Sequence, residues 1–187
     1  KYDLNKDEVY DRAKNRMENT MVDELKSTIR GYNSVTVDNS DVNIKKDLAN
    51  CYHNKKEYAS ALKYYDEILI AKPDDNDIKL NKAIALHALK KYEEAIPLYQ
   101  ELLAKKNDKT IKDNLNTALV ARGHELIDAQ NYGLAVENFK TAIKNGYGDG
   151  YVYYGLAKAY RATGDNSKAS ENYEKAISID PDKTVYS

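Results

Sequence analysis

The sequence predicts an all-α fold in which a single N-terminal helix precedes four stacked helix-turn-helix repeats. Apolar residues recur at helical spacing along most of the 187 residues. The chain has only 8 glycines and 3 prolines, too few for an all-β protein with many tight turns. The third observation is an internal repeat, because four similar segments carry an alanine at the same position: Ala61, Ala95, Ala135 and Ala169.

Residues 1–41 are predicted to hold an N-terminal helix, over 5–31, and a polar link. Asn5 and Glu8 make a start of the capping-box kind, and Gly31 marks the end. Apolar residues recur along this helix at a spacing of four: Val9, Ala13, Met17, Met21, Leu25 and Ile29. This stripe must pack on something, and we expect it to cap the first repeat. A stalk or a dimerisation helix is the alternative.

The four repeats are predicted at residues 42–75, 76–109, 110–149 and 150–183, with a tail at 184–187. Their alanines are 34, 40 and 34 residues apart, so the third repeat has six extra residues. Residues 110–115 are compatible with helix, and we therefore expect a longer first helix there rather than a long loop. A small residue lies twelve positions before each alanine: Ala49, Ala83, Gly123 and Ala157. An aromatic residue follows four positions after it: Tyr65, Tyr99, Phe139 and Tyr173.

These residues resemble the tetratricopeptide repeat family over about residues 42–183. Pro73 and Pro181, each twelve positions after its alanine, and the spacing of 34 belong to the same pattern. The resemblance implies an α-solenoid with a right-handed superhelix, in which the first helix of each repeat lines the concave side. It also implies a non-catalytic scaffold or adaptor that binds a peptide segment in the concave groove.

The charge balance argues against some classes of partner. The 29 basic and 30 acidic side chains give a net charge of −1, which attracts neither nucleic acid nor an anionic membrane. No run of 18 apolar residues occurs, so this segment is not expected to insert into a bilayer. The single Cys51 fits a reducing compartment, and we expect a cytoplasmic location. Because the chain begins at Lys1, the sequence leaves open whether a signal or anchor was removed upstream.

No catalytic motif is recognisable, and we expect no enzyme activity, no cofactor and no metal. The chain lacks a phosphate-binding glycine loop and a nucleophile motif. Cys51 lies on a helix expected to pack, which indicates an unreactive core thiol. His53, His87 and His124 are far apart and have no partner at metal-ligand spacing. All three fall on the expected concave stripe. They are either ordinary polar residues that line the groove, or groups that make peptide binding in the groove sensitive to pH.

The expected peptide-binding residues lie on the outward stripe of the first helices: Lys46, Asn50, Leu80, Asn81, Ile84, Val120, His124, Tyr151, Tyr154, Lys158 and Arg161. Leu80, Ile84 and Val120 form an apolar middle, and Tyr151 and Tyr154 form an aromatic end. Amides and cations flank both, a composition that suits an extended or helical peptide. The alternative is that the apolar residues pack between adjacent repeats.

A subset of this family binds acidic C-terminal tails through a carboxylate clamp, and part of that clamp has a match here. Lys46, Asn50 and Asn81 correspond to three of its donors. The two further donors, a lysine and an arginine, are replaced by Thr117 and Ala121. We therefore favour an ordinary solvated polar face over a working clamp.

The alternative function is self-assembly or tethering, through the N-terminal helix or through the C-terminal repeat face. The residue after the repeat alanine changes from Leu62, Ile96 and Val136 to Ser170 in the last repeat. A wetter outer face is typical of a terminal repeat, although Ile177 lies on the same side. The predicted partner is a protein or a peptide, and the sequence leaves room for a homo-oligomer.

Overall fold

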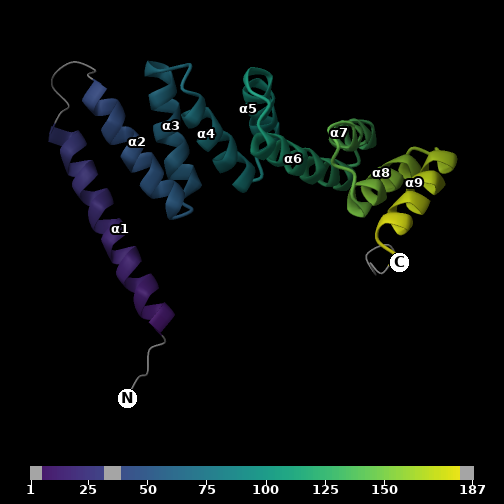
Figure 1. The fold of residues 1–187 in the computed structure, drawn as a ribbon, viewed down its shortest axis with the longest axis horizontal. Helices are drawn as coiled ribbons and strands as arrows, with labels where there is room; N and C mark the ends of the chain where they lie inside the picture. The colour runs from purple at the N-terminus through teal and green to yellow at the C-terminus, as the bar shows by residue number, and fades with distance from the viewer. Residues whose placement is uncertain (1–5, 32–38, 182–187) are drawn as a thin grey trace. The chain divides into compact units, whose positions relative to one another are not determined.

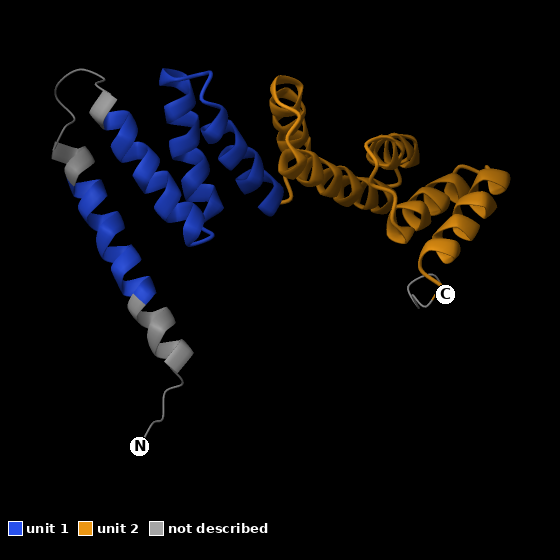
Figure 2. Ribbon diagram, viewed as in Figure 1, with its two compact units in different colours: residues 1–89 blue, residues 90–187 orange. Residues whose placement is uncertain are grey.

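The computed structural model describes residues 6–31 and 39–181, with side chains at 14–27 and 41–181. All regular structure in these ranges is helical, which confirms the predicted all-α fold class. The chain divides into two compact units, residues 1–89 and 90–187 (Figure 2). The predicted tail, most of the predicted link and the Asn5 start of the first helix lie outside the described residues.

The first unit contains α1 (Lys6–Gly31), α2 (Asn39–Asn54), α3 (Tyr58–Ala71) and α4 (Asn76–Ala88). Each of these helices packs on the next one along the chain (Figure 1). Consecutive helices therefore share a core, as expected when one hairpin cannot bury its apolar face alone.

The second unit contains α5 (Tyr92–Lys105), α6 (Lys109–Asp128), α7 (Tyr132–Lys144), α8 (Gly150–Ala162) and α9 (Asn166–Ile179). Each helix again packs on the next, and α6 also contacts α8 (Figure 1). α6 has 20 residues, whereas α4 and α8 have 13 each, so the expected lengthening of this helix is confirmed. The boundary between the units falls after residue 89, inside the segment predicted as the second repeat.

Aspartate residues set the start of four of the described helices, α9 with Asp165 and three first helices of the repeats. The carboxylate at the N-cap accepts a hydrogen bond from a backbone N–H of the first turn: Asp75 from Ile78 in α4, Asp108 from Ile111 in α6, and Asp149 from Val152 in α8. Such a cap is worth about 1 kcal/mol, because those N–H groups have no partner inside the helix. α4, α6 and α8 all carry predicted binding residues, as α2 does.

A left-handed residue ends α2, α6 and α8. Lys56 and Gln130 both have φ of 59°, and Gly164 has φ of 84°. At each of these turns the next residue donates its N–H to the carbonyl of the third-last residue of the helix, over 2.7–3.0 Å. This is the Schellman arrangement, in which glycine is the usual left-handed residue. Only the last of the three turns has glycine at that position.

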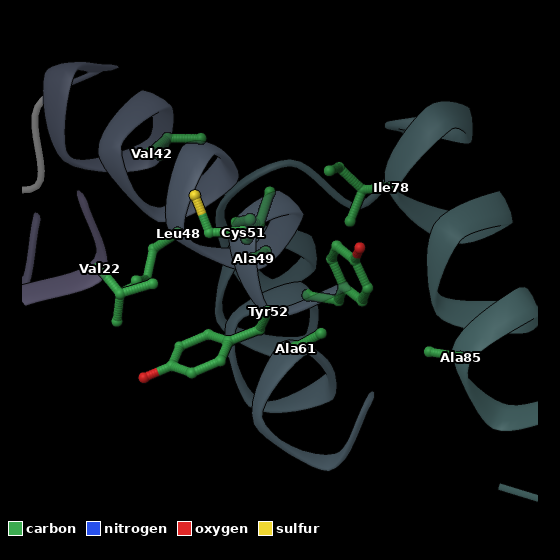
Figure 3. Close-up of a cluster of buried hydrophobic side chains, with 11 residues drawn as sticks. Val22, Val42, Leu48, Ala49, Cys51, Tyr52, Ala61, Ile78 and Ala85 are labelled. Atoms are coloured by element: carbon green, nitrogen blue, oxygen red, sulfur yellow. The ribbon is translucent and has the colours of Figure 1, made fainter. Parts of the chain in front are cut away.

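The core of the first unit joins all four of its helices (Figure 3). Val22 of α1, Leu48 and Tyr52 of α2 and Ile78 of α4 are each at most 6% exposed. Cys51 lies in the same cluster, and burial raises the pKa of its thiol. A buried, protonated thiol is unreactive, as expected from the sequence.

The packing face of α1 differs from the predicted one. Val22 is buried and Leu25 packs against the core, so α1 covers α2. Met17 and Met21 are instead 72% and 48% exposed. The prediction that they pack was wrong because residues four apart advance about 40° around a helix of 3.6 residues per turn. A stripe at a strict spacing of four therefore winds away from any one neighbour.

Candidate peptide-binding surface

Two glycines shape the part of the second unit that positions the candidate residues. A Cβ atom placed on Gly155 of α8 would lie 2.6 Å from Cζ of Phe139, and one on Gly123 of α6 would lie 2.7 Å from it. Phe139 of α7 is fully buried between these glycines. Because neither position has a side chain, α6 and α8 both come close to the same ring.

This close approach brings His124 of α6 against Tyr151 of α8. Their ring centroids are 4.2 Å apart with planes 27° apart, and the His124 ring also meets Phe139 edge-on at 5.0 Å. Burial lowers the pKa of His124, and the positive charge of Lys158 lowers it further. The ring is therefore neutral at pH 7, which suits stacking on Tyr151. Tyr151 itself is 40% exposed and presents its outer side to solvent.

Aromatic and cationic side chains continue along α8. Tyr151, Tyr154, Lys158 and Arg161 share one face because they follow helical spacing of three, four and three residues. The Lys158 nitrogen lies 5.7 Å from the centre of the Tyr154 ring, and that ring also packs on Tyr173 of α9 at 5.9 Å. Both tyrosines keep exposed surface, and Arg161 is exposed. The face combines flat apolar rings with two positive charges.

The candidate residues of the first unit lie on α2 and α4. The Lys46 nitrogen is 2.7 Å from the Asp75 carboxylate that caps α4. Burial opposes ionisation of Asp75, but the hydrogen bonds from Lys46 and from the backbone N–H of Ile78 outweigh it and lower the pKa of the carboxyl. The Lys46 ammonium thus balances the negative charge of the carboxylate that caps α4. This contact argues further against the carboxylate clamp.

The other candidate residues of the first unit are more accessible. Asn50 of α2 is exposed, and Leu80, Asn81 and Ile84 of α4 are half-buried. A half-buried apolar side chain retains some surface for a ligand, so these positions stay candidates.

Val120 was predicted to lie on a solvent-exposed face, and this prediction was wrong. It is 7% exposed and belongs to the core of the second unit. α6 packs against α5, α7 and α8, so a larger part of its circumference is covered than in a helix with two neighbours. Val120 therefore packs between helices and is no longer a candidate binding residue.

All three histidines are partly buried and have a lowered pKa. Nδ1 of His53 is 2.9 Å from the Tyr65 hydroxyl, and the ring also meets Tyr58 edge-on. Burial lowers the pKa of His53 and of His87, as it does for His124. They are therefore neutral packing groups at pH 7.

Sequence reasoning missed the part played by Gly155, although a glycine inside a helix is itself a signal. Glycine there costs about 0.5–1 kcal/mol relative to alanine, so it usually marks a close approach.

Within 14–27 and 41–181, no three His, Cys, Asp or Glu side chains converge as metal ligands would. Over the described helices, none has both the length and the apolar character that a membrane crossing requires.

Comparison with protein families supports the repeat interpretation. Two tetratricopeptide repeat models match, one over residues 47–109 and the other over residues 150–183. Together they cover about half of the chain and include α8 with its aromatic face. No curated protein sequence matches.

Solved structures show the same fold at low sequence identity. MamA of strain AMB-1 is 18% identical with a TM-score of 0.55, and the match covers 94% of this chain and 96% of that one. MamA 41-end from Desulfovibrio magneticus RS-1 is 20% identical with a TM-score of 0.53, over 78% of each chain. A tetratricopeptide repeat protein from Parabacteroides merdae ATCC 43184 is 20% identical with a TM-score of 0.54, over 95% of this chain and 66% of that one.

Proposed function

Because the chain belongs to the tetratricopeptide repeat family, we propose that it is a non-catalytic scaffold that binds a peptide segment on the first helices of its repeats. The observation that carries this proposal is the α8 face, where the exposed ring of Tyr151 and the half-buried ring of Tyr154 lie beside two cations. In the first unit the same proposal extends to Asn50, Leu80, Asn81 and Ile84.

The chemistry of the α8 face selects the kind of peptide. Tyr151 and Tyr154 offer flat rings that favour an apolar or aromatic anchor. Lys158 and Arg161 add charges that favour carboxylates beside that anchor, and Arg161 can bind a carboxylate through two parallel hydrogen bonds. The Tyr151 ring stacks on a neutral His124, so the orientation of the Tyr151 ring is fixed before a ligand binds. The proposed ligand is therefore an acidic segment with an apolar or aromatic anchor.

The test is affinity capture from a lysate of the native host with three baits. The first is the parent chain, and the second carries Lys158→Glu and Arg161→Glu. The control carries Lys175→Glu and Lys140→Glu, which make the same charge change elsewhere in the second unit. Both control lysines are exposed, and the Lys175 nitrogen lies over the ring of Tyr153, on another side of α8.

Circular dichroism first establishes that all three baits are equally helical. A protein bound by the parent and the control but lost by the α8 variant supports the proposal. Its binding segment should then be acidic with an apolar anchor, which a synthetic peptide of that segment tests by titration. Retention of every protein on all three baits would contradict binding at this face.

A further inference from the structure

One edge of the His124 ring is buried against α8 without a hydrogen bond. Within the described side chains, Nε2 of His124 is buried and has no hydrogen-bond partner. Its bonded neighbour Cε1 would lie 2.9 Å from a Cβ atom placed on Gly155, so this edge of the ring faces α8. A neutral imidazole carries a proton on one nitrogen only, whereas a protonated ring carries one on both. A proton at Nε2 of the protonated ring would therefore be a buried donor without an acceptor, which is costly.

The described groups around His124 do not supply that acceptor. The charged groups that act on the ring are Lys158 of α8, Asp149 at the N-cap of α8 and Asp128 at the end of α6. The Lys158 ammonium repels a second positive charge, whereas the two carboxylates attract it without a hydrogen bond to Nε2. Phe139, the neighbour from α7, meets the ring edge-on and presents only carbon atoms. Burial and the Lys158 charge prevail, and they lower the pKa of His124.

Tyr151 is the neighbour that can give way. Its ring stacks on His124 with centroids 4.2 Å apart, yet the residue is 40% exposed, so the ring can turn into solvent without opening the core. Phe139, the other ring against His124, is fully buried and held close to two glycines. A protonated His124 that turns toward water must therefore displace the Tyr151 ring. We propose that mild acid separates the His124 and Tyr151 rings, so that the aromatic end of the α8 face is assembled at neutral pH and dismantled below it.

The switch would regulate peptide binding at the α8 face, a consequence that rests on the proposed function. At neutral pH the fixed Tyr151 ring offers a flat surface to an apolar or aromatic anchor. In mild acid the ring turns freely, so a ligand must first order it, and binding is weaker. Lys158 and Arg161 stay charged under both conditions. The ligand is therefore expected to lose its anchor contact and to keep its carboxylate contacts.

Nuclear magnetic resonance of the whole chain tests the switch without any ligand. Ring-labelled tyrosine makes the tyrosine signals visible, and the spectrum of Tyr151→Phe identifies those of Tyr151 by their absence. The nuclear Overhauser effect between the ring protons of Tyr151 and His124 reports the stack. Between about pH 7.5 and pH 5 this effect should be lost, with a midpoint below about 6.5, the ordinary pKa of histidine. The circular dichroism of the helices should stay constant over the same range.

A pair of histidine variants tests whether His124 is the group that takes up the proton. His124→Phe keeps an aromatic ring that cannot be protonated, so the Tyr151 signals should no longer depend on pH. His53→Gln removes another partly buried histidine, in the first unit, and should leave the dependence of the Tyr151 signals unchanged.

A pair of lysine variants tests the electrostatic cause. Lys158→Met removes the charge that repels a protonated His124, so the midpoint should move up toward about 6.5. Lys175→Met is the matched control, because Lys175 is exposed and its nitrogen lies over the ring of Tyr153, on another side of α8. The control should leave the midpoint unchanged. The lysine pair carries the test alone if His124→Phe does not fold.

Three kinds of result would overturn the proposal. An Overhauser effect that persists at about pH 5 would show that the two rings stay together. The same pH dependence in a folded His124→Phe, or equal midpoints in Lys158→Met and Lys175→Met, would assign the change to other groups. A loss of helical signal with the same midpoint would assign it to unfolding. Because no ligand is used, these failures would leave the proposed peptide binding intact, and a failed capture experiment would leave the ring measurement intact.

Discussion

Replacing Gln130 with glycine is expected to stabilise the second unit, although the change deletes a whole side chain. Gln130 has φ of 59° in the turn after α6, where Cβ of an L-residue crowds the backbone. The equivalent residue after α8 is Gly164, with φ of 84° and open space where a Cβ would lie. The chain thus contains both the strained and the relaxed form of one turn.

The magnitude follows from two opposing effects. Relieving a left-handed residue other than glycine is worth about 1–2 kcal/mol, whereas the extra freedom of glycine in the unfolded chain costs about 0.5–1 kcal/mol. The Gln130 side chain is exposed, and its backbone N–H bonds the Ile127 carbonyl at 2.9 Å, a bond that glycine keeps. The free energy of unfolding should therefore rise by about 0.5–1 kcal/mol.

Urea unfolding followed by circular dichroism at 222 nm measures this change. With a slope of about 2 kcal/mol per M, the midpoint of the Gln130→Gly variant should rise by about 0.4 M. Gln130→Ala is the control, because alanine keeps the crowded Cβ and should bring no gain. Gly164→Gln should lower the midpoint by a similar amount. An equal gain from the alanine variant, or no loss from Gly164→Gln, would refute the backbone argument.

Three further outcomes are expected in thermal or urea unfolding. Gly155→Ala should lower the free energy of unfolding by about 1–3 kcal/mol, because the added Cβ would lie 2.6 Å from the Phe139 ring. Gly133→Ala, where the added Cβ meets open space, should raise it by about 0.5–1 kcal/mol. Equal effects of the two substitutions would contradict this reasoning. Asp75→Ala should cost about 1 kcal/mol at pH 7 through the lost cap of α4, and this loss should shrink below about pH 4, since a carboxyl of lowered pKa stabilises only while it is ionised; a loss independent of pH would argue against the carboxylate. Stability should also fall as the pH drops below about 6.5, because unfolded His124 takes up a proton that burial denies to the folded ring, and His124→Gln should make that fall less steep; an unchanged slope would assign the effect to other groups.

The repeat pattern predicted the helical architecture because its cause is local. Ala61 and Ala135 recur where two helices touch, and both are fully buried. Six extra residues of helix-forming character can only lengthen α6, as observed. Such features depend on spacing along the chain, which a sequence displays directly.

The candidate site was harder to predict because contacts between distant segments decide it. Lys46 is paired with Asp75, 29 residues away, and no local pattern indicates which acid it meets. Val120 is buried because α6 has three helical neighbours. Met17 and Met21 are exposed because α1 turns its other side to α2. In each case the packing of whole helices determines the environment of the side chain.

The single Phe139 ring has a consequence for the cooperativity of unfolding. It comes from α7, yet its glycine neighbours belong to α6, its own hairpin partner, and to α8 of the next hairpin. In a chain of stacked hairpins, total stability is the sum of what each hairpin contributes and what each junction contributes. Shortening Phe139 would remove contacts from the junction as well as from the hairpin. The last hairpin would then melt ahead of its neighbour, and one sharp transition would become two.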